Sequence, residues 1–431
     1  MDRLKIVRNY MSAVRFIHTA DLHLDTPFRG LSVMNPELAR RLKDATFISF
    51  RRITDLCIAR NVDFLIITGD VFDSENKSLA AQLKFSSEMK RLSENGIPTY
   101  IACGNHDPYD TWLGALNLPE NVHRFSTGKC EHLVFEKKGK VLADIHGISY
   151  REASVKENLA RKFSLPATPA PVSVAVLHGT VGLSVPHAEY APFTLDDITG
   201  KGFDYWALGH IHKSRVLRQS DPAVVYPGNP QGRDFGETGL KGCYVVDIQK
   251  DHEPKIEFIP TQAIRLENIS IDLTGVTRIE ELENKITDAI ESFNDTGNES
   301  SLIIRILLTG RTALHKQLIR KEEIQQLLEH FNEGQPVQDR FTWTDSIIAG
   351  TRPDIDIETI REGAGFPSEI LKTFEACSKD TEKLKDLIMA LEDEFANPKA
   401  KKIIGESGLQ DHTGILENAK DILLDKIFTG K

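Results

Sequence analysis

Five short apolar segments of this 431-residue chain run directly into Asp, Asn or His. The first is FIHTADLH, and the others are FLIITGDVFD, TYIACGNHD, VSVAVLHG and DYWALGHIH. Residues two apart in an extended segment point to the same side, so Asp21 and His23 in the first segment can converge on one point. Open α/β sheets bind ligands at the carboxyl ends of their strands. Five polar strand ends at one edge therefore predict a metal site there.

The spacing of apolar residues predicts an α/β fold for the first part of the chain. From Val14 onward, apolar runs alternate with helical patterns expected at about 36–60 and 78–95. Each crossover is long enough for a helix, which predicts parallel neighbouring strands. The continuous apolar run FLIIT indicates a sheet covered on both faces. After Asn121 the β-segments lie closer together and begin with HLVFEKKGKVLADIHGISY, which is typical of two strands around a Lys-Gly turn.

The same patterns divide the chain into four parts. We expect a flexible extension (1–12), an α/β domain (13–262), a small α+β capping domain (263–349) and a helical C-terminal region (350–431). In the capping domain, the strands RLENISIDL and SLIIRILLTG alternate with helices expected at about 278–293 and 313–331. In the C-terminal region, helices are expected at about 368–395 and 413–428.

Composition narrows the class of protein. Hydrophobic residues make up 40% of the chain and charged residues 27%, as in ordinary globular proteins. No apolar run reaches the roughly 18 residues of a membrane span, and MDRLKIVRNY lacks the apolar core of a secretion signal, so we expect a cytoplasmic protein that contacts no membrane. The five cysteines form no C-x-x-C pair, which disfavours a disulfide framework or a zinc ribbon.

The formal net charge of −10 argues against a surface that binds nucleic acid nonspecifically. It does not exclude nucleic acid as a substrate. Carboxylates that hold divalent cations count as negative in this sum although the loaded site is not negative, and a local basic groove can exist on an acidic protein.

The strand-end motifs resemble those of a known family. D-x-H, G-D-x-x-D, G-N-H-D, H-G and G-H-x-H, in this order from Asp21 to His212, are similar to the motifs of calcineurin-like metallophosphoesterases. Within that family, FIHTADLHLD, GDVFDSE and VVYPGNPQGRDFGETGLKGCYVVDI resemble the SbcD- and YhaO-like nucleases of double-strand-break repair. The resemblance covers about residues 15–261 and, in topology, the capping domain. It implies an αββα sandwich for the first domain.

The resemblance also implies two divalent metal ions. One would be held by Asp21, His23, Asp70 and His212. The other would be held by Asp70, Asn105, His178 and His210, so that Asp70 bridges the two. Imidazole and carboxylate ligands without a thiolate favour Mn²⁺, with Fe, Zn or Mg as alternatives.

The motif positions imply a catalytic pair as well. A hydroxide between the two ions would attack phosphorus, His106 would protonate the leaving oxygen, and Asp107 would orient His106. A neighbouring carboxylate raises the pKa of an imidazole and fixes its tautomer, as a general acid requires. One departure concerns Asp73, because some family nucleases carry a His at this position. A role for this position in placing the substrate is therefore in doubt.

The other polar residues near these motifs have simpler interpretations. We interpret Asp25 and Asp73 as loop-capping residues and His18 as a packed histidine. Three histidines have no motif context and are interpreted as structural: His123, His146 and His187. Four basic residues near the strand ends could contact phosphates or lie on the solvated surface: Arg29, Lys213, Arg215 and Arg233.

Three functions stay open at this point. The first is a DNA phosphodiesterase for DNA repair, an exonuclease with some single-strand endonuclease activity. The second uses the same metals on a small-molecule or phosphoprotein substrate, because the motifs determine the reaction and not the substrate. The third is a noncatalytic scaffold, which the presence of both His106 and Asp107 disfavours.

The C-terminal region indicates a protein partner. It is more acidic than basic, so it is a poor candidate for binding DNA phosphates. One stripe at helical spacing is predicted from Ile415, Leu416, Ala419, Ile422, Leu423, Ile427 and Phe428. This stripe could pack on the protein itself or bind another protein. The resemblance implies an SbcC-like coiled-coil ATPase docked through these helices, and a homodimer.

Overall fold

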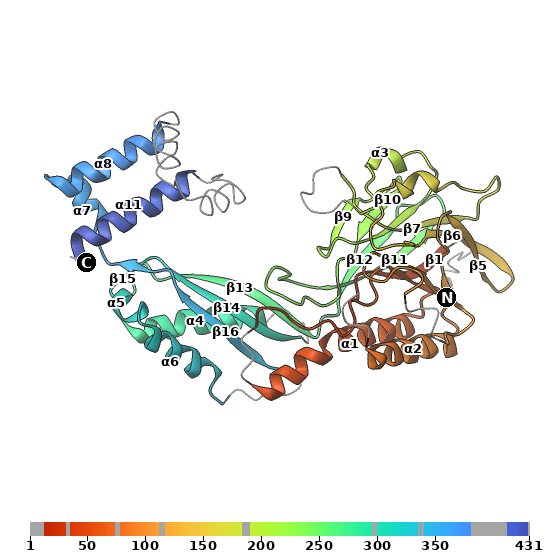
Figure 1. The fold of residues 1–431 in the computed structure, drawn as a ribbon, viewed down its shortest axis with the longest axis horizontal. Coiled ribbons are helices and arrows are strands. Elements are labelled where there is room, and N and C mark those ends of the chain that lie inside the picture. Colours follow the sequence, from red (N-terminus) through yellow and green to blue (C-terminus); the bar gives the residue numbers. More distant parts are fainter. Residues whose placement is uncertain are drawn as a thin grey trace, which may run out of the picture. The chain divides into compact units, whose positions relative to one another are not determined.

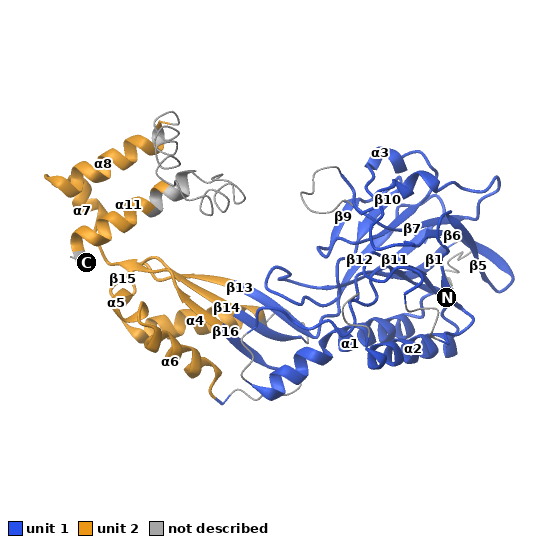
Figure 2. Cartoon of the chain, in the orientation of Figure 1, with its two compact units in different colours: residues 1–268, 297–304, 334–345 blue, residues 269–296, 305–333, 346–431 orange. Residues whose placement is uncertain are grey.

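The computed structural model describes most of the chain (Figure 1). The described residues are 13–31, 35–73, 78–111, 117–182, 190–294, 300–334, 337, 340–380 and 412–429. The expected extension 1–12 and His187 lie outside them. The chain forms two compact units (Figure 2). Unit 1 comprises residues 1–268, 297–304 and 334–345, and unit 2 comprises residues 269–296, 305–333 and 346–431.

Unit 1 contains a six-stranded sheet with a parallel centre. The parallel strands are β1 (Ala13–Thr19), β2 (Phe64–Thr68), β3 (Thr99–Ala102) and β4 (Val122–Arg124). Two antiparallel strands, β11 (Gly242–Gln249) and β12 (Lys255–Pro260), complete the order β12-β11-β1-β2-β3-β4. The predicted parallel pairing of the first strands is confirmed.

Two helices connect these parallel strands and cover one face of their sheet. They are α1 (Pro36–Ala59) and α2 (Leu79–Glu94), close to the predicted ranges. The side chain of Asn35 accepts two backbone N–H groups at the start of α1, and that of Ser78 accepts one at the start of α2, which satisfies donors that a helix leaves unpaired. Their apolar faces bury Phe50 and Phe85, whose rings stack at 5.6 Å.

A second six-stranded sheet packs against the first. Its strands are β5 (Glu131–Lys137), β6 (Lys140–Ile148), β7 (Val172–His178), β8 (Tyr205–Gly209), β9 (Arg215–Arg218) and β10 (Ala223–Tyr226), in the order β5-β6-β7-β8-β10-β9. Buried side chains from both sheets form one core, in which Phe16 of β1 contacts Tyr205 of β8. The helices η2 (Leu159–Lys162) and α3 (Leu195–Ile198) carry residues of the core on the other side of this sheet. The expected αββα sandwich is confirmed.

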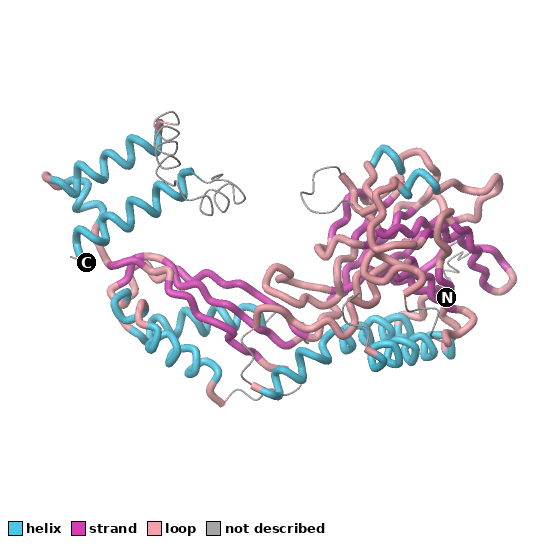
Figure 3. Tube along the Cα trace, viewed as in Figure 1, coloured by secondary structure: helices cyan, strands magenta, loops and turns pink. Residues whose placement is uncertain are grey.

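The segment after this sandwich forms a three-stranded sheet with helices (Figure 3). The strands are β13 (Ile264–Asp272), β14 (Ser301–Thr309) and β16 (Thr342–Ala349), and the helices are α4 (Ile279–Asn294), α5 (His315–Leu318) and α6 (Lys321–Asn332). The prediction of one helix over 313–331 is wrong, because Arg320 is extended and separates α5 from α6. Glu322 and Glu323 favour a new helix start there, since acidic side chains stabilise a helix N-terminus.

The C-terminal region is helical where it is described. Its helices are α7 (Ile357–Glu362), α8 (Phe366–Lys379) and α11 (His412–Thr429), and a short parallel pair joins β15 (Arg311–Thr312) to β17 (Arg352–Pro353). The expected helix over 368–395 ends already at Lys379, because Asp380 is extended, and residues 381–395 lie outside the described residues. None of the described helices has the length and apolar character of a membrane span.

The apolar stripe predicted for the last helix is only partly right. Among the residues of α11 whose burial is described, Leu424 is fully buried, and the predicted stripe did not include it. Ile422 and Leu423 instead expose 46% and 37% of their surface, and Phe428 exposes 48%. Ion pairs from Arg311 to Asp421 and Asp425 on α11, at 2.8 and 3.1 Å, help to hold the helix in this orientation. The packed face of α11 is therefore rotated away from the predicted one.

Candidate metal centre

The loops that follow β1, β2, β3, β7 and β8 meet at one edge of the sandwich, as the strand-end motifs predict. Backbone hydrogen bonds join the first two loops, because the N–H of Asp21 donates to Gly69 O at 3.1 Å and that of His23 donates to Asp70 O at 3.0 Å. The side chains of Asp21, His23 and Asp70 are at most 2% exposed. These carboxylates and imidazoles are therefore held in place and shielded from water.

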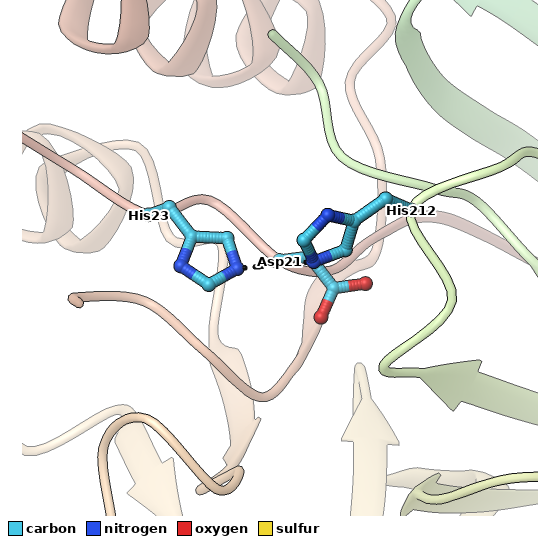
Figure 4. Close-up of side chains that lie close together, drawn as sticks. All are labelled: Asp21, His23 and His212. Atoms are coloured by element: carbon cyan, nitrogen blue, oxygen red, sulfur yellow. Dashed lines mark hydrogen bonds between the residues drawn. The ribbon is translucent and has the colours of Figure 1, made fainter. Parts of the chain in front are cut away.

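One group of convergent side chains consists of Asp21, His23 and His212 (Figure 4). The Nε2 atoms of His23 and His212 are 3.2 Å apart. His212 Nδ1 lies 2.6 Å from Glu237 Oε1, so Nδ1 carries the proton and Nε2 presents a lone pair toward His23. His23 Nδ1 is buried without a hydrogen-bond partner. Convergent ring nitrogens of this kind fit a cation between them.

A second group consists of Asp70, His178 and His210, with Asn105 beside them. His178 Nδ1 donates to Thr68 O at 3.0 Å, which directs Nε2 into the group. Asn105 Oδ1 lies 2.9 Å from His178 Nε2 and 3.1 Å from His210 Nδ1. The structure thus brings together the side chains that the resemblance assigned to the second ion.

Asp70 belongs to the second group and also approaches the first. Its Oδ2 atom is 3.4 Å from His178 Nε2 and 3.9 Å from His23 Nε2, one residue of each group. Its Oδ1 atom accepts the backbone N–H of His106 at 2.9 Å, which fixes the carboxylate. This placement is the one that a bridging carboxylate requires, and the bridge itself stays a prediction.

The backbone at these residues is unusual. Four predicted ligands adopt positive φ: Asp21 (52°), His23 (42°), Asp70 (49°) and His210 (97°). Such conformations are uncommon for residues other than glycine, and they persist where the surrounding structure enforces them, often at functional sites. Gly69 also has positive φ, and a Cβ there would collide with the ring of His178. The backbone therefore adopts unfavourable conformations that let the ligands approach one another closely.

The electrostatics of the centre favour a bound cation. Burial lowers the pKa of His210 to about 3 and lowers that of His23 well below its usual range, so both rings are neutral and can ligate a metal. Burial acts to raise the pKa of Asp70, but His178 and His23 hold it below the usual range. Burial acts to lower the pKa of His178, yet Asp70 and Asp21 raise it to about 9. Nearby positive charge therefore stabilises the buried carboxylates, and a bound cation would supply such charge.

The contacts of Asp107 differ from the expected ones. Asp107 was expected to orient His106, but its carboxylate accepts three backbone N–H groups, from Asp70 (3.1 Å), Val71 (2.7 Å) and Gly104 (2.7 Å). Asp107 therefore ties the loop after β2 to the loop after β3. The carboxylate that contacts the His106 ring is that of Asp73, whose Oδ1 lies 3.1 Å from Nδ1. The interpretation of Asp73 as a loop cap therefore missed this contact.

A small cavity opens beside His106. It has a volume of about 110 Å³ and is lined by His23, Thr26, Pro27, Arg29, Asp73, His106, Arg233 and Asp234. Two of the four basic residues named above, Arg29 and Arg233, thus line this cavity. Lys213 and Arg215 are exposed and do not line it. The side chain of His106 is 37% exposed and is therefore accessible from solvent.

Two of the histidines that were interpreted as packed or structural, His18 and His123, are packed against other side chains. His18 is buried and contacts Tyr205 Oη at 3.0 Å and Thr68 Oγ1 at 3.2 Å. His123 stacks on Tyr100 with ring centroids 5.3 Å apart. Asp25 belongs to none of the described groups that could hold a metal.

Sequence reasoning missed Glu237, which lies in the glycine-rich segment GRDFGETG. Besides His212, its carboxylate accepts hydrogen bonds from Asn229 Nδ2 at 2.8 Å and from Arg233 N at 2.9 Å. Burial acts to raise its pKa, but His212 and Arg233 hold that pKa well below the usual range. A carboxylate on the far side of a ligand imidazole sets its tautomer and raises its basicity. Glu237 is therefore part of the centre.

Comparison with known proteins finds family models and a relative that match most of this chain. The family model "Calcineurin-like phosphoesterase" matches residues 14–214, and "Metallophosphoesterase YhaO, middle domain" matches residues 267–352. The chain is 38% identical over 333 residues to the "Uncharacterized metallophosphoesterase YhaO" of Bacillus subtilis, covering 77% of this chain and 81% of YhaO.

Two more distant relatives are named for DNA repair or nuclease activity. The "DNA double-strand break repair protein Mre11" of Sulfurisphaera tokodaii is 26% identical, covering 72% of this chain and 77% of that protein. The SbcD component of the nuclease SbcCD of Escherichia coli is 24% identical, covering 75% of this chain and 84% of SbcD.

Proposed function

Because the chain belongs to the calcineurin-like phosphoesterase family, we propose that it is a two-metal DNA phosphodiesterase. In this proposal it acts as an exonuclease in DNA repair and also cuts single-stranded DNA. The observation that carries the proposal is the pair of convergent side-chain groups that Asp70 approaches, next to the His106 side chain in the wall of a cavity. The names of the Mre11 and SbcD relatives support DNA as the substrate.

The proposed metal ions fit the residues of the centre. Asp21, His23 and His212 would hold one ion together with Asp70, and Asn105, His178 and His210 would hold the other. We propose Mn²⁺, which suits mixed imidazole and oxygen ligands, with Fe, Zn and Mg as alternatives. When bound, such ions activate water and neutralise charge on the phosphoryl oxygens.

The residues of the chain itself supply the proton and position the phosphate. Asp73 accepts a hydrogen bond from His106 Nδ1, so Nε2 is the ring nitrogen left to act on the substrate. In its doubly protonated form the ring would give the Nε2 proton to the leaving oxygen of the cleaved bond and become the neutral ring that keeps its Nδ1 proton on Asp73. Arg233 and Arg29 line the same cavity, where their positive charge favours a phosphate. In this proposal the proton donor His106 and the two arginines that bind the phosphate therefore line the same cavity.

A small-molecule or phosphoprotein substrate is the second candidate. The cavity beside His106 is small, and the described residues that line it are mainly charged and polar and offer no apolar platform on which a base would stack. Such a cavity can accept a phosphate group from many kinds of molecule. The two candidates therefore differ in what binds outside the cavity.

The substrate class is tested by hydrolysis of labelled linear duplex DNA, single-stranded DNA and bis-p-nitrophenyl phosphate, each with Mn²⁺, Mg²⁺ or Zn²⁺. We expect degradation of DNA from its ends, fastest with Mn²⁺. His106→Ala should slow DNA cleavage by roughly 10²–10⁴-fold while metal content stays constant. His123→Ala, at a histidine outside the centre, is the matched control. Hydrolysis of the small diester without cleavage of any DNA would favour the second candidate.

We also propose that the C-terminal helices bind an SbcC-like ATPase. The exposed apolar side chains of Ile422, Leu423 and Phe428 support this proposal. A cavity of about 620 Å³ lies beside Phe428 and is lined in part by Ile355 and Ile360. A homodimer and a cytoplasmic location stay predictions from the sequence.

The docking proposal is tested by co-purification with the ATPase encoded in the same genome. The double substitution Ile422→Asp and Leu423→Asp should abolish binding without loss of phosphodiesterase activity, because both side chains are exposed. Leu83→Asp is the control, since Leu83 is 60% exposed on α2. Normal co-purification of the double variant would rule out docking through this face.

A further inference from the structure

The hairpin of β5 and β6 carries a second cluster of potential metal ligands, away from the strand-end centre. His132 on β5 pairs directly with His146 on β6. Asp144 precedes His146 by two residues, so its side chain points to the same face of the sheet. Directly opposite residues and their diagonal neighbours on one face lie within reach of each other. The register alone therefore brings two imidazoles and one carboxylate together.

The side chains of the cluster are in contact. His132 Nε2 lies 2.7 Å from Asp144 Oδ1, and the rings of His132 and His146 stack with centroids 4.5 Å apart and an interplanar angle of 7°. One nitrogen of each histidine and one oxygen of Asp144 lie within 4.8 Å of one another. Such a set can close around a single ion with small side-chain rotations.

Two of the three side chains in the cluster are buried, which distinguishes it from an ion pair on the protein surface. His146 and Asp144 are each 3% exposed, and the second oxygen of Asp144 accepts the backbone N–H of Ala170 at 2.6 Å. His146 Nε2 is buried and has no hydrogen-bond partner. A buried polar atom without a partner destabilises the folded state, because it loses its hydrogen bonds to water. An ion pair between His132 and Asp144 with a stacked ring accounts for the other contacts and leaves this atom unexplained.

We propose that His132, Asp144 and His146 bind a divalent transition-metal ion of the Zn²⁺ class. Two imidazoles and a carboxylate are a common ligand set for such ions, with water in the remaining position. The side chain of His132 is 36% exposed, which leaves solvent access for that water. Burial, aided by His132, lowers the pKa of His146 to about 4, so its ring is neutral at pH 7 and its lone pair is available.

The ion would stabilise the edge of the second sheet. β5 is an edge strand of that sheet and contributes His132 to the cluster. The ion would tie β5 to β6 and, through Asp144, to the backbone at Ala170. Asp144 and His146 pair with Ser173 and Ala175 on β7, five and three residues before His178. The two sites are therefore separated by roughly 10–17 Å along the strand.

The proposal is tested by counting ions. The full chain is dialysed to equilibrium against micromolar Zn²⁺, and bound zinc per chain is measured by mass spectrometry. His132→Ala should bind one zinc ion fewer than the wild type while hydrolysing bis-p-nitrophenyl phosphate at the wild-type rate. His252→Ala removes an exposed histidine and should bind as many ions as the wild type. Equal zinc content in the wild type and His132→Ala would overturn the proposal.

A second variant and a melting-temperature measurement test the site independently of whether His132→Ala folds normally. Asp144→Asn keeps the volume and an acceptor for Ala170, and it should also lose one ion even if another variant folds poorly. Added Zn²⁺ should raise the melting temperature of the wild type more than that of His132→Ala, and an equal rise would count against the site. If the strand-end centre bound no metal, the wild type would hold one ion and His132→Ala none, so failure of the proposed function would be seen separately.

Discussion

Asp107→Ala is the substitution that most sharply separates the observed role of this carboxylate from its expected one. In the structure Asp107 is fully buried and accepts three backbone N–H groups from two loops. If it served mainly to orient His106, its loss would slow catalysis and leave the fold intact. Because it clamps the loops that carry Asp70 and Asn105, its loss should instead destabilise the protein and weaken metal binding.

The expected loss of stability follows from the three backbone N–H groups that would lose their acceptor in Asp107→Ala. A buried N–H left without its partner costs about 1–3 kcal/mol, so three of them amount to roughly 3–9 kcal/mol. Burial and the charge of Asp70 raise the pKa of Asp107 to about 7, so the carboxylate is itself costly to bury and offsets part of this sum. We therefore expect a loss of about 3–5 kcal/mol in the free energy of unfolding.

The assay is urea unfolding at pH 7 in EDTA, which removes any contribution from bound metal. Asp110→Ala is the matched control, because Asp110 lies three residues away on the surface and should change stability by no more than about 0.5 kcal/mol. A loss below about 1 kcal/mol for Asp107→Ala would refute the clamp. That result, combined with slow cleavage at normal metal content, would restore the orienting role.

Three further predictions concern single contacts. Asp73→Ala should slow DNA cleavage by about tenfold or more at unchanged metal content, yet spare bis-p-nitrophenyl phosphate, whose leaving group needs little protonation. Glu237→Gln should lower metal affinity by roughly 10–100-fold in a metal titration, whereas Glu253→Gln on the surface should not. Thr194 and Arg161 help to hold the pKa of Asp197 below its usual range, so this carboxylate stabilises the fold above pH ~4 and loses that effect as the pH falls. The stability difference between wild type and Asp197→Asn should accordingly shrink in acid unfolding curves.

The strand-end residues were predictable because their positions follow from the strand pattern. Apolar runs locate the strands, parallel strands align their carboxyl ends, and polar residues after those ends must therefore meet. The same logic predicted both crossover helices, whereas the αββα sandwich followed from the family resemblance. Family resemblance then divided the ligands into two sets, and the side-chain groups around His212 and His178 each contain three residues of one set, while the division itself stays a prediction.

The roles that sequence reasoning missed depend on contacts between distant segments. Asp107 follows His106 directly, yet its partners are backbone groups, which carry no signature in the sequence. Asp73 reaches His106 across two loops, and Glu237 reaches His212 from a segment that is rich in glycine for other reasons. The rotated face of α11 has a similar cause, because the ion pairs of Arg311 fix it.

The central claim is that Asp70 serves two metal ions at once, and metal content of Asp70→Ala tests it most directly. Wild type, Asp70→Ala and His178→Ala are loaded with Mn²⁺, freed of excess metal and analysed for bound ions per chain. Because Asp70 Oδ2 approaches residues of both groups, Asp70→Ala should hold two ions fewer than the wild type and show no phosphodiester hydrolysis. His178→Ala should lose mainly one. An Asp70→Ala protein that retains the wild-type number of ions would contradict the account.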